Sequence, residues 1–308
     1  MEKFTDWRDK GTGIAPFLPQ TPLLSLESGV RRIANNGILV LKLIITLPLI
    51  LISSLLYWTP LKKPLWKLLL KLLCNFQVQV TCQGVKKRDL SSKHLPRKGQ
   101  LYLVNYTSPL DALALYFSSQ GEPVFLIPHV KDKDVKLYKL RVLEFIQFTL
   151  RGSLFEDGDN FPTISQLSDV EGYTAFLFPE GTSSNGKSIL PFAVTQEFLD
   201  KFVGQEEGVS NSVSNPQNKL RGDWELQTIS LKVNTVLVTP LKIGSWKYLV
   251  RMSSTGVNYK CKISEPTGGK IDQLRTVMCG GDKYKLVGKE LNVASKKRFV
   301  KAYGDRRR

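Results

Sequence analysis

From Gln77 onward, short apolar runs alternate with stretches in which apolar residues recur at helical spacing. This alternation restricts the possible fold classes more than any other feature of the chain. Short runs rich in branched and aromatic residues are typical of buried strands. Such runs occur at 101–104, 124–127, 173–178 and 236–238. Apolar residues recur at helical spacing in 109–119, 135–150 and 195–202. Strands and helices that alternate in this way predict an α/β fold, with one sheet flanked by helices.

Further elements are expected at both ends of this region. Val78, Val80 and Cys82 alternate with polar residues, as in a half-buried strand. We expect another strand at 257–263, closing helices at 271–279 and 282–303, and a flexible polar insertion at 204–223. We therefore divide the 308 residues into an N-terminal cytosolic or interfacial segment (1–37), a membrane-anchoring part (38–76), one catalytic-sized domain (77–266), and C-terminal helices with a basic tail (267–308).

Ile38 to Trp58 is nearly all apolar and is just long enough to cross a hydrocarbon core of roughly 30 Å. Leu61 to Phe76 follows, with a lysine at every fourth position from Lys63 to Lys71, which is the pattern of a basic helix lying in the membrane interface. The two segments form either one span followed by an interfacial helix or a hairpin in one leaflet. A buried core helix is the alternative to a membrane segment.

The formal net charge of +17 indicates an anionic partner. The apolar run favours a membrane surface with anionic lipid, and no nucleic-acid recognition motif is present, so we expect no nucleic acid. Lysines follow the apolar run without acidic residues among them, which places the remaining chain on the cytosolic side. Four scattered cysteines and two histidines favour a reduced domain without a metal site.

The string Asn105-Tyr106-Thr107-Ser108-Pro109-Leu110-Asp111 follows a predicted strand. Its second half has the form of a helix start, because serine is a preferred N-cap, proline suits the first helical position, and aspartate favours the positive end of the helix dipole. This structural explanation accounts for Ser108, Pro109 and part of the role of Asp111 without any chemistry.

A second string, Phe178-Pro179-Glu180-Gly181-Thr182-Ser183, also follows a predicted strand closely. Its loop is expected at the carboxyl end of that strand, where ligands bind in α/β sheets. Glycine allows backbone N–H groups to approach an anion, and Thr182 adds a hydroxyl donor. Lys187 is near enough in the sequence to add positive charge.

In this order and spacing the two strings resemble the paired signatures of the glycerolipid acyltransferases. Gly152-Ser153-Leu154-Phe155 and Val238-Thr239-Pro240-Leu241 resemble two further motifs of that family. The resemblance implies a glycerol-3-phosphate acyltransferase-like sheet flanked by helices, and it makes 77–266 the acyltransferase domain. It also assigns Glu180, Gly181 and Thr182 to the glycerol phosphate of the acceptor. Gly158 stands where the family has a phosphate-binding arginine, and Arg151 is the candidate substitute.

The resemblance breaks at one position, because Tyr106 stands where the family has its catalytic histidine. In the family that histidine takes the proton of the acceptor hydroxyl, and the aspartate at the position of Asp111 orients it. A phenol of pKa near 10 is protonated at neutral pH. Three alternatives follow: Asp111 is itself the base, His129 approaches from another loop, or Tyr106 only donates a hydrogen bond at a slow or silent site.

The first nineteen residues and 280–287 resemble a divergent fungal branch of the family, found on endoplasmic reticulum and lipid droplets, whose first signature also lacks the histidine. That resemblance implies acylation of lysophosphatidic acid, or a related lysophospholipid, to phosphatidic acid. Acyl-CoA is a co-substrate and no cofactor is expected. The competing hypothesis is a non-catalytic lipid-binding homologue that acts in membrane organisation or trafficking.

Overall fold

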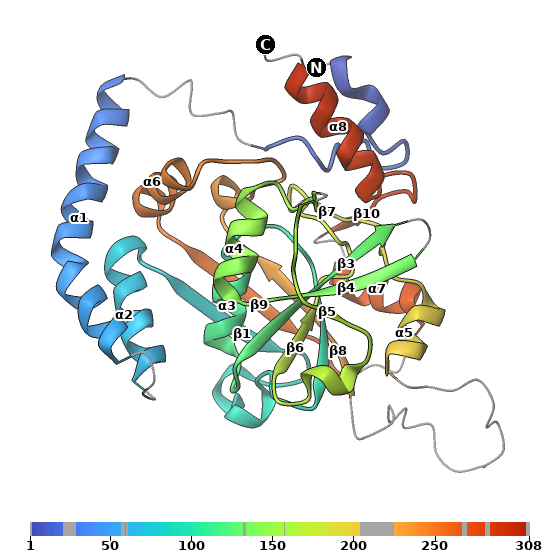
Figure 1. Ribbon diagram of the computed structural model, residues 1–308, viewed down its shortest axis with the longest axis horizontal. Coiled ribbons are helices and arrows are strands. Elements are labelled where there is room, and N and C mark those ends of the chain that lie inside the picture. Colours follow the sequence, from blue (N-terminus) through green and yellow to red (C-terminus); the bar gives the residue numbers. More distant parts are fainter. Residues whose placement is uncertain are drawn as a thin grey trace.

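The computed structural model describes residues 2–20, 29–56, 59, 61–131, 134–156, 158–203, 225–266, 270–280 and 284–305. The predicted insertion at 204–223 and the three C-terminal arginines lie outside the described residues. The described part is a mixed α/β structure built on a central sheet (Figure 1). This confirms the predicted fold class.

Within the described residues the central sheet has the strand order β1-β9-β8-β2-β6-β3-β4-β5. Its middle strands β8, β2, β6 and β3 are mutually parallel, whereas β9, β4 and β5 join by antiparallel pairs. A small parallel pair joins β7 and β10. The strands are β1 (Gln77–Cys82), β2 (Gln100–Val104), β3 (Pro123–Lys131), β4 (Asp134–Leu140), β5 (Thr163–Ile164), β6 (Thr174–Leu177), β7 (Ser188–Ile189), β8 (Glu225–Lys232), β9 (Asn258–Ile263) and β10 (Lys285–Leu286).

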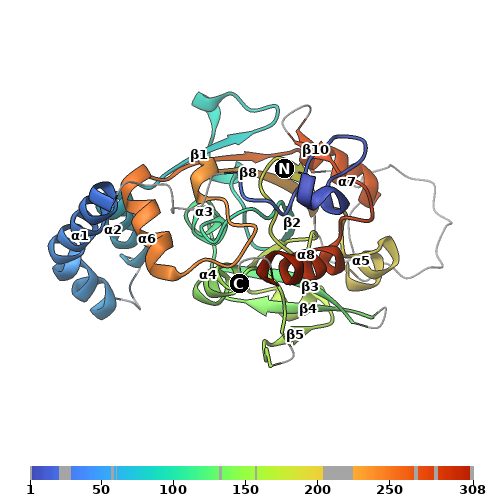
Figure 2. The same cartoon turned by 90° about the horizontal axis from the view of Figure 1, so that it is seen from above.

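Helices cover both faces of this sheet, as the two perpendicular views show (Figures 1 and 2). Residues of α3, α4 and α6 share one buried apolar cluster with strand residues, and residues of α5 and α7 share a second. The middle strands are buried on both sides, which explains why they read as continuous apolar runs in the sequence. The helices are α1 (Gly29–Leu55), α2 (Lys62–Cys74), α3 (Asp111–Ser118), α4 (Val142–Leu150), α5 (Gln196–Val203), α6 (Ser245–Thr255), α7 (Ile271–Cys279) and α8 (Val293–Asp305).

Three of the expected elements differ from the structure. Residues 135–150 divide into strand β4 and helix α4, because β4 forms an antiparallel hairpin with β3. Residues 235–237 form a 3-10 helix rather than a strand, since β8, which the sequence did not predict, already pairs with β2. The expected helix at 282–303 begins only at Val293, after the short strand β10.

Helices α1 and α2 form a lobe at one end of the molecule, and α6 lies between them and the sheet (Figure 2). The side of α1 that packs inward is partly polar: Thr46 and Ser53 are buried, and Lys42 donates from Nζ to the carbonyl of Ser253 on α6 over 2.9 Å. The outward side is apolar, with Ile44, Ile45 and Leu55 among its exposed residues. This polarity is the reverse of that of a water-soluble surface helix.

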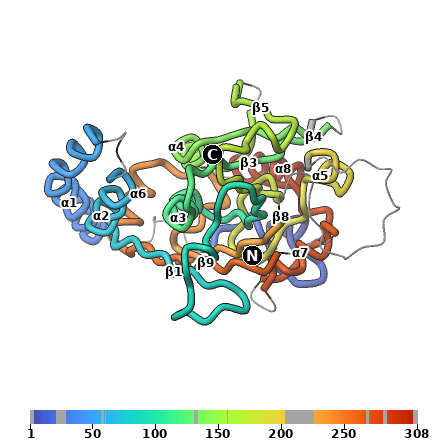
Figure 3. The backbone as a smooth tube through the Cα atoms, turned by 90° about the horizontal axis from the view of Figure 1, so that it is seen from below, coloured from blue at the N-terminus to red at the C-terminus, as the bar shows by residue number. Residues whose placement is uncertain are grey.

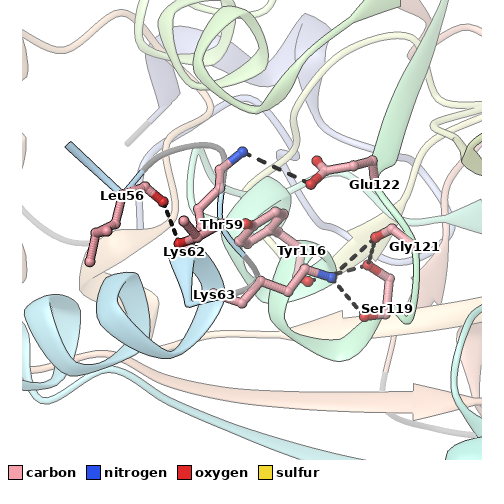
Figure 4. A network of polar contacts seen from close by, with 8 residues as sticks. All are labelled: Leu56, Thr59, Lys62, Lys63, Tyr116, Ser119, Gly121 and Glu122. Atoms are coloured by element: carbon pink, nitrogen blue, oxygen red, sulfur yellow. Dashed lines mark hydrogen bonds and ion pairs between the residues drawn. The ribbon is translucent and has the colours of Figure 1, made fainter. Parts of the chain in front are cut away.

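Helix α2 docks on the domain through its first two lysines (Figure 4). Lys63 donates from Nζ to the carbonyls of Ser119 and Gly121, which follow the end of α3, over 3.1 and 3.2 Å. Lys62 lies 3.9 Å from the carboxylate of Glu122. Lys63 is therefore turned toward the domain, which the four-residue lysine pattern did not predict, while Lys67 and Lys71 remain exposed.

The two ends of the chain pack together beside the second sheet. The N-terminal segment meets α8 through aromatic rings, with the Phe4 and Phe299 centroids 5.4 Å apart and those of Trp7 and Phe299 5.5 Å apart. Phe17 is fully buried in the same cluster. Asp9 accepts the backbone N–H of Gly288 over 2.8 Å. The described end segments, 2–20 and 284–305, thus belong to the folded structure, and in Figure 1 they lie at the side of the molecule opposite the connection between β1 and β2, which projects from the lower edge of Figure 3.

Candidate active site

The two sequence motifs meet because β2 and β6 are adjacent and parallel. Each motif follows the carboxyl end of its strand, so both loops open at the same edge of the sheet. Two hydrogen bonds join the loops directly: the N–H of Tyr106 donates to Oε1 of Glu180 over 2.9 Å, and the N–H of Ser184 donates to the carbonyl of Tyr106 over 3.0 Å. The sheet topology therefore brings together residues more than seventy positions apart.

Asp111 is fully buried at the first residue of α3 and organises the first loop. Its Oδ2 accepts the N–H groups of Thr107 and Ser108 over 2.8 and 2.9 Å, and its Oδ1 accepts the hydroxyl of Tyr259 over 2.7 Å. Burial raises the pKa of Asp111 to about 6, while the hydrogen bonds that it accepts act in the opposite direction. The helix therefore begins at Asp111, with Leu110 at its N-cap, so Ser108 is not the N-cap and Pro109 is not the first helical residue as predicted, whereas the aspartate does lie in the first turn.

The side chain of Tyr106 lies in the apolar core. Its ring is fully buried, with the centroids of Phe145 and Phe178 each 5.0 Å away. Its hydroxyl lies 2.5 Å from Oγ1 of Thr149 on α4. Burial raises the pKa of this phenol well above its usual value. Tyr106 is therefore held as a neutral core residue, and its backbone N–H and carbonyl connect the two loops.

Replacing Tyr106 with phenylalanine tests this placement. The change removes one hydroxyl and leaves the hydroxyl of Thr149 bonded to the carbonyl of Phe145 over 2.8 Å. We therefore expect the free energy of unfolding to fall by only about 1 kcal/mol. If the hydroxyl has no chemical role, the rate of acyl transfer stays within about threefold of wild type, far from the roughly 10²- to 10⁴-fold loss of a general base. Denaturant unfolding and acyl transfer by Tyr106→Phe are the measurements, and a loss of that larger size would give the phenol a catalytic role.

Glu180 connects three segments from a fully buried position. While Oε1 accepts the N–H of Tyr106, Oε2 accepts the N–H of Leu190 over 2.8 Å. Burial raises the pKa of Glu180 to about 8, against the effect of its two backbone donors and the nearby charge of Arg275. Glu180 therefore holds the conformation of both loops through its two oxygens.

Gly181 follows in a left-handed conformation, with a φ of +68°. A Cβ atom there would lie 3.2 Å from the carbonyl oxygen of Pro128 and 3.2 Å from a methyl group of Val293 on α8. Only glycine fits both the backbone angle and this close approach.

Thr182 and Ser183 are fully buried and contact a residue that the sequence did not indicate as functional, Lys296. Its Nζ donates to Oγ1 of Thr182 over 2.9 Å and to the carbonyl of Ser183 over 2.8 Å. Thr182 in turn donates to the carbonyl of Ser153 over 2.7 Å. One signal was available: helical spacing places Lys296 on the apolar face of α8, together with Phe299.

The remaining candidates lie outside this hydrogen-bonded centre. His129 is on β3, with its ring against Tyr138 and Phe155 at centroid distances of 5.7 and 5.0 Å. Arg151 pairs with Asp159 over 3.0 Å, and the side chain of Lys187 is exposed. Their roles stay predictions. Among the described residues no group of three or more His, Cys, Asp or Glu side chains is arranged to hold a metal.

Comparison with known proteins gives the family. No family model matches the chain. The chain is 43% identical over 308 residues to "Lysophosphatidic acid:oleoyl-CoA acyltransferase 1" of Saccharomyces cerevisiae, which covers 98% of this chain and 97% of that protein. It is 28% identical over 212 residues to "Putative lysophosphatidic acid:oleoyl-CoA acyltransferase" of Schizosaccharomyces pombe, covering 62% of this chain and 67% of that protein.

One solved structure also matches, that of the 1-acyl-sn-glycerophosphate acyltransferase PlsC from Thermotoga maritima. The match has 16% identity and a TM-score of 0.38, and covers 88% of this chain and 97% of that one. The family rests on the first relative, because its 43% identity is measured over nearly the whole length of both proteins. The chain belongs to the lysophosphatidic acid acyltransferase family.

Proposed function

We propose that this protein transfers an acyl group from acyl-CoA to the free hydroxyl of lysophosphatidic acid and so forms phosphatidic acid. The hydroxyl oxygen bonds to the thioester carbonyl carbon, the carbon–sulfur bond breaks, and the hydroxyl proton passes through a base to the sulfur of coenzyme A. The observation that carries this proposal is the direct joining of the two motif loops through Tyr106 and Glu180 at one edge of the sheet. The name of the Saccharomyces relative states the same acceptor and an acyl-CoA donor, which supports these substrates.

Of the three alternatives for the missing histidine, we favour Asp111 as the base. Its pKa of about 6 makes it a stronger base than an ordinary aspartate while leaving it ionised at neutral pH. The phenol of Tyr106 is neutral and packed among aromatic rings. His129 remains the alternative from another strand, and His129→Ala in the same assay separates the two.

The lobe of α1 and α2 is the proposed membrane contact. Helix α1 is the described helix that is long and apolar enough to cross a bilayer, and it presents its apolar side outward. Leu68 and Leu72 of α2 extend the exposed apolar surface, and exposed Lys67 and Lys71 lie beside them. This combination suits a surface with anionic lipid. We place the catalytic domain on the cytosolic side of the endoplasmic reticulum and of lipid droplets, where acyl-CoA is available.

Purified protein in liposomes tests the function. With oleoyl-CoA and lysophosphatidic acid we expect formation of phosphatidic acid and release of coenzyme A in equal amounts, by protein that sediments with anionic liposomes. Product is measured by mass spectrometry and the free thiol by colorimetry. Binding of the lysolipid without turnover, together with a gain of activity in Tyr106→His, would instead identify a non-catalytic lipid-binding homologue.

A further inference from the structure

Lys296 is fully buried and has no acidic partner among the described residues. Besides the carbonyl of Ser183 and Oγ1 of Thr182, its Nζ contacts Oγ of Ser183 over 3.1 Å. All three partners are neutral oxygens. Burying a cation without a counter-ion is costly, and burial lowers the pKa of Lys296, with the charge of Glu180 acting against it. A methionine would fill the same space without this cost, so a role in packing alone does not account for a lysine.

The loop that Lys296 supports has donors available for an anion. Among the described residues the backbone N–H groups of Thr182 and Ser183 make no hydrogen bond, although both residues are fully buried. They follow Gly181, whose left-handed backbone is one of the conformations found in anion-binding concavities. The hydroxyls of Thr182 and Ser183 donate to other carbonyls, so all three bonds of Lys296 need a proton from its Nζ, as an ammonium group supplies. The loop therefore combines free amide donors with a positive charge behind it.

Thr239 provides a second and independent observation at the same place. Its carbonyl accepts the hydroxyl of Ser183 over 2.9 Å, and its N–H donates to the carbonyl of Thr107 over 3.1 Å. Its own hydroxyl is buried and has no hydrogen-bond partner among the described residues. A buried hydroxyl without a partner costs free energy, and a ligand oxygen in the loop would satisfy it.

The position of Lys296 depends on both ends of the chain. Helix α8 is fixed by the aromatic contacts of Phe299 with Phe4 and Trp7, and the indole N–H of Trp7 donates to the carbonyl of Ser295 over 3.2 Å. The N-terminal segment also reaches the motif loop, because the N–H of Asn185 donates to the carbonyl of Pro16 over 2.8 Å. The two ends of the chain thus hold the lysine and the loop in one arrangement.

The family resemblance assigns the loop at Thr182 to the acceptor phosphate, and we propose two residues beyond it: Lys296 determines specificity for an anionic acceptor by positioning the Thr182–Ser183 loop and placing a positive charge behind it, and the hydroxyl of Thr239 is a further donor to the phosphate. The inference rests on the proposed function, whose acceptor carries that phosphate. Lys296 acts through the loop and is a positioning residue, whereas the loop amides and Thr239 touch the ligand.

The test compares Lys296→Met, Thr239→Val and, as a matched control, Lys297→Met, which removes the same charge from an exposed position on α8. For Lys296→Met we expect the KM for lysophosphatidic acid to rise about 10- to 100-fold, as for a lost charge-assisted hydrogen bond, while the KM for oleoyl-CoA stays unchanged. Thr239→Val is expected to raise the KM for lysophosphatidic acid about fivefold without lowering Tm, since the hydroxyl has no partner to lose. Lys297→Met is expected to match wild type.

The proposal would be overturned by unchanged KM values in both site variants. It would also be overturned if KM rose equally for lysophosphatidic acid and oleoyl-CoA. If Lys296→Met does not fold, Thr239→Val decides: an unchanged KM for lysophosphatidic acid overturns it. Glycerol 3-phosphate provides a readout that needs no turnover, because a ligand of the folded state raises Tm. A Tm rise in wild type that both site variants lose would support the site even if acyl transfer were absent, whereas acyl transfer with unchanged KM values would leave the proposed function standing without this site.

Discussion

Asp111→Ala is expected to lower the free energy of unfolding by about 3 kcal/mol and to abolish acyl transfer. The change leaves the N–H groups of Thr107 and Ser108 and the hydroxyl of Tyr259 without their acceptor in a fully buried place. Three unsatisfied donors cost roughly 3 to 9 kcal/mol. The pKa of this carboxylate is raised by burial, so its charge destabilises the folded state at neutral pH. Removing it therefore increases the free energy of unfolding by on the order of 3 kcal/mol, which offsets part of that cost. Denaturant unfolding and the liposome assay measure the two effects.

The matched control is Asp272→Ala, which removes an exposed aspartate from the first turn of α7. Asp272→Ala should lower the free energy of unfolding by no more than about 1 kcal/mol, which is the usual contribution of an exposed charge at a helix terminus. Equal destabilisation by the two substitutions would contradict the role given to the buried hydrogen bonds of Asp111.

Asp111→Asn separates the charge from the hydrogen bonds, because an amide oxygen can still accept both N–H groups. The pKa of Asp111 is about 6 in the folded protein, above its ordinary value of 3.8, so the folded state binds more protons between these values. The stability that this group contributes is present below about pH 4 and is lost as the pH rises through about 6. As the pH rises through these values, the free energy of unfolding of wild type should therefore fall by on the order of 3 kcal/mol relative to that of Asp111→Asn, as measured by denaturant unfolding at each pH.

Glu180→Ala is the second substitution with a large expected effect. It leaves the N–H groups of Tyr106 and Leu190 unpaired and removes the direct side-chain bond between the two motif loops. We expect acyl transfer to fall to background and the free energy of unfolding to fall by about 2 kcal/mol, because two buried donors lose their acceptor while a buried carboxylate is removed. Initial rates in liposomes and denaturant unfolding measure both.

Glu197→Ala is the control, since Glu197 is exposed in the first turn of α5. It should retain wild-type activity. Glu180→Gln should have an activity between those of wild type and Glu180→Ala. Its amide keeps one acceptor oxygen, but its NH2 group faces the second backbone N–H and cannot accept from it. Full activity in Glu180→Ala would show that the joining of the loops does not serve the reaction.

The strands beneath the active site could be predicted because their signal is local. Strands β2 and β6 are buried on both faces, so their sequences are continuous apolar runs. Their positions, and those of the loops that follow them, could therefore be predicted from the sequence. Strand β4 was predicted as helix because it is defined by its pairing with β3, which periodicity within one segment does not report. Strand β8 was missed next to the polar insertion for the same reason: its place is given by its pairing with β2.

By itself, the sequence determined the α/β class, the apolar N-terminal helix, the two motifs and the resemblance that the comparison with the Saccharomyces relative then confirmed. These depend on residue type and spacing along one segment. Only the tertiary structure decided that Tyr106 packs into the core and that Lys296 reaches the second motif from 113 positions away. Contacts between distant segments arise when the sheet and the two chain ends assemble; local spacing indicates which face of an element is buried, as for Lys296, and does not indicate which residues that face meets.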